Sequence, residues 1–468
     1  MNLLLSKTRF WFSLIRFIPY ETDTPEGRSK ERLRRVALTA IVSAIAYGIN
    51  ILTSLVSVPL TLNYLGTERY GLWVSMSSLI IVLGFADLGL GNGLLNAITE
   101  ANGRSDVKAA KSYVSSAFFM LVAVALIFAM VWVVIYPRVS WSWLFNVSSP
   151  QAIAELGPAL SIFVLCMLVN LPLSLIQKIQ DGYQQGYLNG IWRAVGSLLG
   201  LAGVLLAISF QAGLPALVMA MAGAPLVALL INSLLLFGRQ RAWLRPRWRM
   251  FNQAAFIRIF KNGMLFFVLQ LAVAIGFQSD YLVIAHYLGS DQVPQYSVPM
   301  RLFMFIPAIL GFVIAPLWPA YGEAIARKDA TWVTKTFKRS LFLSFCLSVP
   351  LSIFLVLFGD TIIKLWVGSE IQPETILLVG LGLWVILLSF GNPISMLLNA
   401  ANVITFQVIC ASLMVLGNIA FSIFLVQRLG VSGPVFGSIT SWMIFSLLPS
   451  MFFIPRLFAS WQNIRIST

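Results

Sequence analysis

The chain has 468 residues, of which 59% are hydrophobic and only 10% are charged, and its mean hydropathy is +0.86. A soluble domain does not need that much apolar surface. A transmembrane helix takes roughly 20 apolar residues, so the composition places nearly the whole chain in a membrane and leaves little for a soluble domain. The formal net charge of +15 would suggest a nucleic-acid partner in a soluble protein, so the distribution of the charge has to be examined first.

The first 35 residues form a basic segment of their own. Lys7, Arg9 and Arg16 interrupt an apolar run, and the charged run GRSKERLRR follows. These interruptions are too frequent for the core of a signal peptide. We therefore expect residues 1–35 to contain an amphipathic helix that lies on the membrane surface.

Six apolar spans follow, and together they predict a first lobe at residues 36–237. They cover residues 36–60, 70–98, 110–136, 153–176, 190–210 and 214–237. Within the first span, Tyr47, Asn50, Ser54 and Ser57 recur at helical spacing. Such a polar stripe faces either a cavity or neighbouring helices to which it donates hydrogen bonds, and the sequence leaves both readings open.

A basic linker at residues 238–257 separates the first lobe from a second set of six spans. These spans cover residues 260–286, 294–321, 332–358, 375–400, 404–426 and 431–454, and we assign the second lobe to residues 258–456 and a tail to 457–468. Five arginines crowd the linker, which is typical of a loop held at an anionic cytoplasmic leaflet.

The two halves repeat each other. Shifted by 223 positions, residues 83–100 fall without a gap on residues 306–323, and Tyr-Leu-Gly-Thr-Glu at 64–68 falls on Tyr-Leu-Gly-Ser-Asp at 287–291. Helix-breaking residues at corresponding places in two halves point to a transporter's central site. The aligned hinge candidates are Gly84 with Pro307 and Gly93 with Pro316.

The fold class that follows is all-α. An even number of spans in each half predicts two parallel six-helix repeats, about twelve transmembrane helices in all, related by an axis along the membrane normal. With the N-terminus inside, about 27 of the 32 Lys and Arg residues lie on one side. This positive-inside bias predicts that both termini are cytoplasmic, and it explains the net charge without nucleic acid.

Three charges inside the spans are functional candidates, because burying a charge in a membrane is costly. Asp280 and Arg301 lie seven residues from Tyr287 and Pro294, which flank one short turn. Both therefore lie roughly 10 Å from that turn on neighbouring helices, and we expect an ion pair that serves either transport or helix register. Asp87 lies in the glycine-rich stretch and either caps a broken helix or lines a cavity.

Two glutamates end the corresponding spans two and eight. Glu100 and Glu323 are each followed four residues later by an arginine, Arg104 and Arg327. We interpret them as gate candidates at the cytoplasmic side or as simple pairs at helix ends. The loops contain no phosphate-binding motif, no metal-ligand spacing and no nucleophile with a base, so we expect neither an enzyme nor a cofactor.

The run VPLTLNYLGTERYGLWVSMSSLIIVLGFADLGLGNGLLNAITEANGRSD and the later segment DYLVIAHYLGSDQVPQYSVPMRL resemble the polysaccharide-transporter family of O-antigen flippases. The resemblance covers nearly the whole chain and is most specific in its first 110 residues. It implies a two-lobed bundle like those of the multidrug and oligosaccharidyl-lipid exporters. It further implies that the protein moves an undecaprenyl-pyrophosphate-linked oligosaccharide across the bacterial inner membrane.

The resemblance also assigns roles to the buried charges. Arg301 matches a cationic cavity position that holds the anionic glycan or pyrophosphate, and Asp280 matches an acidic position of the seventh span. Asp280 could carry a coupling ion, H⁺ or Na⁺. The expected partners are the lipid-linked glycan, membrane lipids and other polysaccharide assembly proteins. A multidrug exporter on the same fold and a non-transporting scaffold of a glycan assembly complex remain the alternatives.

Overall fold

The structure is a computed structural model that describes residues 18–83, 85–368 and 370–466, with side chains except at 78–83 and 462–466. Every regular element within the described backbone is a helix, and no strand occurs there. This confirms the all-α fold class. In a bilayer the backbone polar groups must be satisfied within each segment, which helices achieve.

Ten helical segments of the described chain are long and apolar enough to cross a membrane. Two of them, Pro25–Ser77 with 53 residues and Ile404–Trp461 with 58, exceed twice the roughly 20 residues that one crossing needs. The protein is therefore a multi-pass membrane protein. The number of twelve spans stays a prediction.

The chain divides into two compact units, Met1–Met264 and Leu265–Thr468. The division falls inside one continuous helix, α10 (Gln253–Leu288), at a point a few residues beyond position 258, where we expected the second lobe to begin. The first residues of α10 thus belong to the first unit and the remainder to the second.

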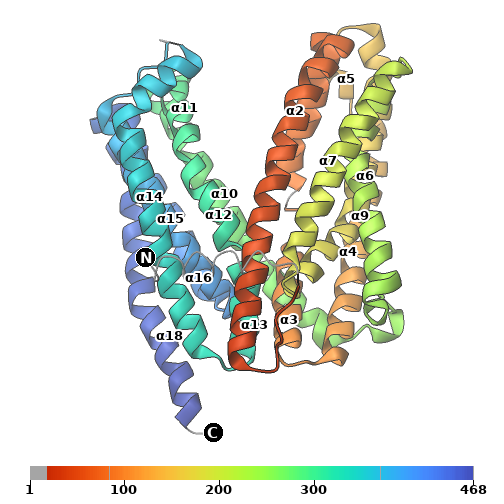
Figure 1. The fold of residues 1–468 in the computed structure, drawn as a ribbon. Helices are drawn as coiled ribbons and strands as arrows, with labels where there is room; N and C mark the ends of the chain where they lie inside the picture. Colours follow the sequence, from red (N-terminus) through yellow and green to blue (C-terminus); the bar gives the residue numbers. More distant parts are fainter. Residues whose placement is uncertain (1–17, 84, 369, 467–468) are drawn as a thin grey trace. The chain divides into compact units, whose positions relative to one another are not determined.

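The first unit begins with α2, in which two helical stretches meet at the non-helical residue Gly66, and continues with shorter helices (Figure 1). Its α-helices before α10 are α2 (Pro25–Leu83), α3 (Leu90–Gly103), α4 (Val107–Ile135), α5 (Trp141–Leu144), α6 (Pro150–Gly182), α7 (Gly186–Ser209), α8 (Leu214–Val218) and α9 (Ala224–Leu235). The start of α6 shows how the sequence sets these ends. Ser149 Oγ accepts a hydrogen bond from the backbone N–H of Ala152 at 3.3 Å, and Pro150 occupies the first helical position.

The second unit contains the rest of α10 and the later helices. They are α11 (Val293–Phe303), α12 (Phe305–Ile314), α13 (Leu317–Ala326), α14 (Ala330–Val367), α15 (Thr375–Ala400), α16 (Ile404–Leu429), α17 (Gly433–Trp442), the π-helix η8 (Met443–Leu447) and α18 (Leu448–Ile466). Its core lies where α11, α12, α15 and α17 meet. Fully or nearly fully buried members of this core are Tyr296, Phe303, Leu381, Val385 and Val435.

The internal repeat is visible in the backbone of the two turns at Gly66 and Gly289. Gly66 has φ 76° and ψ 170°, and Gly289, 223 positions later, has φ 103° and ψ 152°. Both pairs of angles lie in a region that only glycine occupies readily. The duplicated Tyr-Leu-Gly sequence therefore encodes the same turn twice.

The repeat is equally clear at the opposite ends of the spans. Ser105 and Lys328, again 223 positions apart, both have left-handed backbones, with φ 57° and 59°. The next residues, Asp106 and Asp329, both cap a helix by accepting a hydrogen bond from the backbone N–H three residues on, at 2.9 and 3.2 Å. Matched conformations at unlike residues such as Ser105 and Lys328 support a true duplication.

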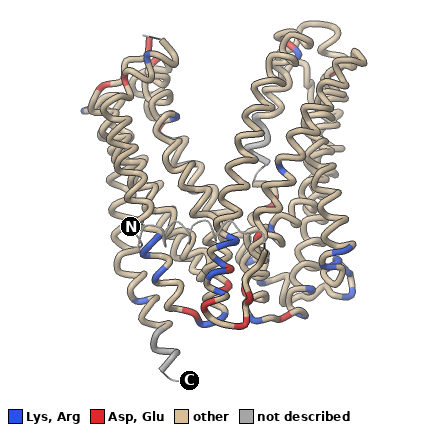
Figure 2. Tube along the Cα trace, viewed as in Figure 1, with Lys and Arg blue, Asp and Glu red and all other residues tan. Residues whose placement is uncertain are grey.

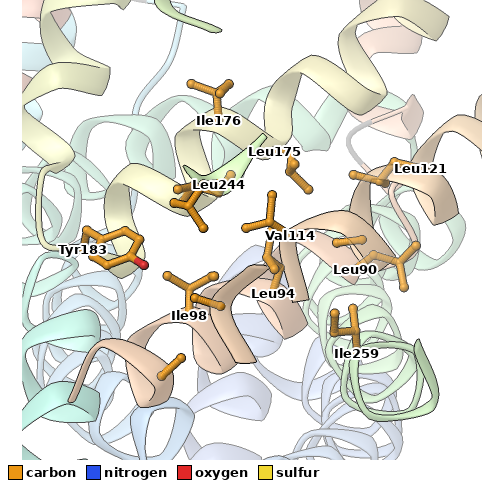
Figure 3. Close-up of a cluster of buried hydrophobic side chains, with 14 of the residues drawn as sticks. Leu90, Leu94, Ile98, Val114, Leu121, Leu175, Ile176, Tyr183, Leu244 and Ile259 are labelled. Carbon is orange, nitrogen blue, oxygen red and sulfur yellow. The ribbon is translucent and has the colours of Figure 1, made fainter. Parts of the chain in front are cut away.

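The first unit has its largest core near its basic end, where α3, α4, α6, the linker and the start of α10 meet (Figure 3). Labelled members are Leu90, Leu94, Ile98, Val114, Leu121, Leu175, Ile176, Tyr183, Leu244 and Ile259. Within a bilayer such packing stabilises chiefly through van der Waals contacts. The early part of α10 is thus built into the core of the first unit.

The predicted linker at residues 238–257 is packed against the first unit. Leu244 is fully buried, and the backbone N–H of Arg247 donates to Ser115 Oγ of α4 at 3.2 Å. Arg241 lies over the ring of Tyr183, with its guanidinium carbon 3.5 Å from the ring centroid. Burial lowers the pKa of Arg241, and the neighbouring Tyr183 opposes that shift. The arginines of this segment therefore help to fix the linker in place.

Charged residues lie mainly at one end of each unit (Figure 2). In the first unit this end carries the turn between α3 and α4, and in the second unit the turn between α13 and α14. The apolar remainder of each unit matches the hydrophobic interior of a bilayer.

Replacing Gly66 with Ala should destabilise the protein, because an L side chain would enter a glycine-only backbone region. We expect a loss of about 1–3 kcal/mol, measured as a lower thermal unfolding midpoint of the purified protein in detergent. Gly71→Ala on the same helix is the matched control, since nothing lies within 4 Å of its added Cβ. An unchanged midpoint for Gly66→Ala would contradict the role of this turn.

Candidate functional site

A buried carboxylate on α10 forms the centre of the candidate site in the second unit. Asp280 is only 3% exposed. A carboxylate shielded from water in this way must receive hydrogen bonds, be neutralised by a proton or bind a cation. Its surroundings therefore decide what it can do.

Four side chains from three other helices donate to the Asp280 carboxylate. Tyr296 Oη and Ser438 Oγ donate to Oδ2 at 3.0 and 2.9 Å. Asn418 Nδ2 and Ser422 Oγ donate to Oδ1, each at 3.2 Å. We call these five residues the Asp280 cage. None of the donors is a cation.

The cage depends on a close approach of α16 and α17. Asn418 and Ser422 are one turn apart on α16, so both face the same neighbour. A Cβ added at Gly437 of α17 would lie 2.5 Å from Ser422 Oγ and 2.7 Å from its backbone nitrogen. Only a glycine fits there, and the next residue, Ser438, is thereby brought to the carboxylate.

Further oxygen atoms crowd the same place. Ser422 Oγ lies 3.0 Å from Asn418 Oδ1 and 3.4 Å from the carbonyl oxygen of Pro434, and Ser438 Oγ lies 3.1 Å from Asn418 Oδ1. Each hydroxyl has one proton and cannot donate to all of these acceptors at once. A set of one carboxylate and several neutral oxygens is chemically suited to a hard cation or to a proton on the carboxylate.

The expected ion pair between Asp280 and Arg301 is wrong: within the part of the chain that the structure describes, no ion pair joins them. Tyr296 on α11 reaches Asp280, and Arg301 is five residues further along the same helix. Five residues turn an α-helix by about 140°, so the two side chains leave α11 on different faces. Arg301 is exposed.

A second exposed cation is Arg193 on α7, which the sequence did not single out. Gly190 packs against Val42 of α2, and Ser197 Oγ accepts a hydrogen bond from Asn50 Nδ2 at 3.1 Å. Arg193 therefore lies level with the stretch of α2 between Val42 and Asn50. No described carboxylate forms an ion pair with it. The sequence feature that could have identified Arg193 as a site candidate is its position as a lone arginine three residues inside the predicted span 190–210.

The residues of the polar stripe on α2 differ in exposure and in hydrogen bonding, so they do not all fit one of the two predicted roles, lining a cavity or bonding to helices. Tyr47, Asn50 and Ser54 are exposed, and Asn50 also bonds Ser197 of α7. Ser57 is half-buried, and its hydroxyl donates to the Ser54 carbonyl at 3.5 Å, within its own helix. The exposed part of the stripe and Arg193 thus occupy neighbouring positions on α2 and α7, and their role in lining a cavity stays a prediction.

Asp87 caps a broken helix. Its Oδ1 accepts from the backbone N–H of Gly89 at 2.9 Å, and its Oδ2 accepts from Gly91 at 3.2 Å. Leu88 and Gly89 have left-handed backbones, which separate α2 from α3. Of the two roles expected for Asp87, the hydrogen bonds fit the capping role, and ion coupling stays untested.

The hinge candidates lie at different kinds of position. Gly84 is outside the described residues. Gly93 is inside α3, where an added Cβ would lie 2.8 Å from the carbonyl oxygen of Ile259 on α10, so it permits close packing. Pro307 follows the break between α11 and α12 at Met304, and Pro316 occupies the break between α12 and α13. Whether these residues act as hinges stays a prediction.

Both glutamate gate candidates form ion pairs at helix ends. Glu100 pairs with Arg104 at 2.9 Å and also with Arg258 of α10, and Glu323 pairs with Arg327. The pair with Arg258 ties α3 to the first part of α10 within the first unit. Gating by either glutamate stays a prediction.

Solved structures with a similar fold are membrane transporters. A crystal structure of a MATE protein in its bent conformation aligns with 93% of this chain and 98% of its own, with a TM-score of 0.80 and 15% identity. A MOP superfamily transporter from Pyrococcus furiosus aligns with 92% of this chain and 96% of its own, with a TM-score of 0.77 and 14% identity. At these identities the likeness shows the fold alone, which is MATE-like.

Sequence comparison gives the family. Residues 37–325, more than half of the chain, match the family described as polysaccharide biosynthesis protein, and the chain belongs to this family. A proposed O-antigen transporter of Salmonella typhimurium is 22% identical over 399 residues, which cover 83% of this chain and 89% of that protein. A proposed O-antigen export protein of Yersinia pseudotuberculosis is 24% identical over 348 residues, which cover 71% and 76%.

Substitutions of Asp87 separate its two possible roles. Asp87→Ala removes both acceptors at the start of α3 and should destabilise the protein by about 1 kcal/mol, seen as a lower unfolding midpoint. Asp87→Asn keeps one acceptor oxygen and should retain most of the stability and normal transport per inserted molecule. An Asp87→Asn protein that inserts normally and does not transport would show that the charge itself is needed.

Proposed function

We propose that this protein is a flippase, which moves an undecaprenyl-pyrophosphate-linked oligosaccharide from the inner to the outer leaflet of a bacterial inner membrane for polysaccharide or lipopolysaccharide assembly. The observation that carries the proposal is the family match, together with relatives proposed as O-antigen transporters that align over most of their length. The MATE-like fold and the absence of catalytic motifs from the sequence agree with transport rather than catalysis.

The proposed orientation places both termini in the cytoplasm. It rests on the excess of Lys and Arg at the ends where α3 meets α4 and α13 meets α14. On this orientation the turns that contain Gly66 and Gly289 lie on the periplasmic side.

We further propose that exposed arginines bind the anionic part of the substrate. Arg301 and Arg193 are cations within apolar helices, and neither forms an ion pair with a described carboxylate. Charged groups at membrane depth rarely face lipid, and an arginine presents a planar set of donors that suits phosphate oxygens. Tyr47 and Asn50 are candidates for contacts with the glycan, because hydroxyl and amide groups can pair with sugar hydroxyls.

The multidrug-exporter alternative fits these cations less well. An exposed arginine repels a cationic drug and attracts an anion, so Arg301 and Arg193 favour an anionic substrate, although Asp181 also interacts electrostatically with Arg193. A non-transporting scaffold would not need an oxygen-rich cage around a buried carboxylate. Other polysaccharide assembly proteins remain proposed partners.

The Asp280 cage is the proposed site for the coupling ion. A proton on the carboxyl group would remove the charge, whereas Na⁺ would be held by the carboxylate and the neighbouring oxygens of Asn418, Ser422 and Ser438. In either case binding of the cation changes the net charge of the buried Asp280 cage, and such a change can drive a switch between two conformations. Alternating access would then be driven by the ion gradient.

Substitution of Arg301 tests the substrate proposal. Arg301→Ala removes a charge-assisted hydrogen bond worth about 1.5–3 kcal/mol, so we expect about 10- to 100-fold less glycan export per inserted molecule. Arg301→Lys keeps the charge without the planar donors and should be intermediate. The control is Arg428→Ala, an exposed arginine that lies over Phe424 on α16. Normal export by Arg301→Ala would remove this residue from the substrate site.

Substitution of Asp280 tests the coupling proposal. Asp280→Asn keeps the shape of the cage and cannot take up a proton or hold Na⁺ as a charged ligand. In proteoliposomes with an imposed Na⁺ or pH gradient, the wild type should respond to one of the two gradients and Asp280→Asn to neither.

The matched control is Asp360→Asn, an exposed acid of α14 that pairs with Lys364 at 2.6 Å. Ser438→Ala distinguishes the ions: it should raise the Na⁺ concentration needed for half-maximal transport if Na⁺ is the coupling ion. A gradient response that survives in Asp280→Asn refutes coupling at this site.

A further inference from the structure

The Asp280 cage stands at one end of a cavity of about 290 Å³ that lies wholly within the second unit. Helices α10, α12, α15, α16, α17 and α18 contribute to its wall, together with η8. Asp280 and Ser438 are part of the lining. Asp280 is the one charged side chain among the described residues that line it.

The far end of the cavity lies close to the turn between α15 and α16. Its lining includes Leu398, two residues before α15 ends, and Phe406 and Gln407, which lie in the first turn of α16. Asp280, by contrast, lies eight residues from the other end of α10. The cavity thus extends from the cage toward the turn at residues 401–403, which is cytoplasmic in the proposed orientation.

The wall of the cavity carries polar groups that need partners. Asn392 and Ser395 of α15, Ser446 of η8 and Ser450 of α18 line it, and none makes a hydrogen bond to another residue of the described chain. Ser450 is buried and the other three are half-buried, and buried amide and hydroxyl groups are nearly always hydrogen-bonded, to protein or to water. A space of this size has room for several water molecules. These groups are therefore suited to a hydrated cavity.

The polar groups form a line that leads to the cage. Ser438, Trp442, Ser446 and Ser450 follow one another at intervals of four residues, so they share one face across α17, η8 and α18. The π-helical turn Met443–Leu447 lies in the middle of this line, and such turns are frequent at functional positions.

One large side chain interrupts the line. Trp442 lies between Ser438 and Ser446, and a Cβ added at Gly391 of α15 would be 3.0 Å from Cζ2 of its indole. Trp442 thus adds an apolar ring to the face that carries these serines, and the ring packs against α15 at Gly391.

We propose that this cavity is an aqueous route through which the coupling cation passes between the cytoplasmic face and Asp280. The route lies inside one unit. Its wall is mostly apolar, but it offers a cation hydroxyl and amide oxygens and a terminal carboxylate, without a repelling cation in the described lining. The inference rests on the proposed coupling role of Asp280 and on the proposed orientation.

The test measures access to the cavity directly. In a background with Cys166, Cys346 and Cys410 replaced by serine, Ser446→Cys places a thiol in the cavity wall, and Leu448→Cys, two residues on and 48% exposed, is the matched control. The probe is a membrane-impermeant trimethylammonium methanethiosulfonate, added to inside-out vesicles or to right-side-out spheroplasts. We expect Ser446→Cys to react at least ten-fold faster than Leu448→Cys in inside-out vesicles, and not in spheroplasts.

Equal rates for the two cysteines in inside-out vesicles, or reaction of Ser446→Cys only in spheroplasts, would overturn the proposed route. Ser395→Cys on α15 is the second variant, for use if Ser446→Cys inserts poorly. Asn392→Leu supplies the functional arm: an apolar side chain in the wall should slow gradient-driven transport at least ten-fold and leave binding of the lipid-linked glycan unchanged. Unchanged gradient-driven transport in Asn392→Leu would also count against the route.

The same experiment separates this inference from the proposed function. If Ser446→Cys is labelled from the cytoplasmic side while Asp280→Asn keeps its gradient response, the aqueous route exists and coupling at Asp280 is wrong. If Asp280→Asn loses its gradient response while Ser446→Cys stays unlabelled, coupling at Asp280 holds and the route is wrong.

Discussion

The burial of one carboxylate without a cationic partner constrains much of the second unit. Placing Asp280 in an apolar helix costs free energy that only a dense set of donors or a bound cation offsets. Four donors come from α11, α16 and α17. To bring these donors together, α16 and α17 approach each other so closely at Gly437 that no side chain fits there. A merely structural ion pair would not need this geometry.

Duplication explains the features that the two halves of the chain share, but the Asp280 cage is present in the second half alone among the described residues. The two copies share their outer glycine turns and their capped inner turns, at an offset of 223 residues. At the position of Asp280 the first copy has Ser57, whose hydroxyl bonds within its own helix. Asymmetry of this kind is what a duplicated bundle needs if one unit binds an ion.

The sequence predicted helices and turns well, because both depend on features that are local in the chain. Hydrophobic length predicts a span, glycine at 66 and 289 predicts a turn, and counting residues from a turn gives depth. The pairing of Asp280 with Arg301 failed, because depth says nothing about the rotation of a helix about its axis. Rotation depends on packing against neighbours that a sequence does not reveal.

The sequence analysis did not identify the donors of the Asp280 cage or Arg193, and the reasons are related. Asn418, Ser422 and Ser438 are small polar residues in apolar spans, and only their convergence on one carboxylate distinguishes them from other serines and asparagines. Arg193 was not among the buried-charge candidates, because it lies only three residues inside the predicted span 190–210 and the boundary between a span and its loop is uncertain by a few residues. Its exposure on α7 became clear only from the packing of Gly190 and Ser197 on α2.

Helix α10 offers a physical link between the ion site and the first unit. Its first residues lie in the core of that unit, where Gly263 packs on Leu90 and Arg258 pairs with Glu100. Its later residues carry Asp280, 22 positions and about 33 Å further along the same helix. Coupling between distant sites needs an element with two arrangements that both sites bias. Helix α10 contributes residues to both units, so it is the element on which such coupling would depend if the proposed ion binding at Asp280 shifts this helix.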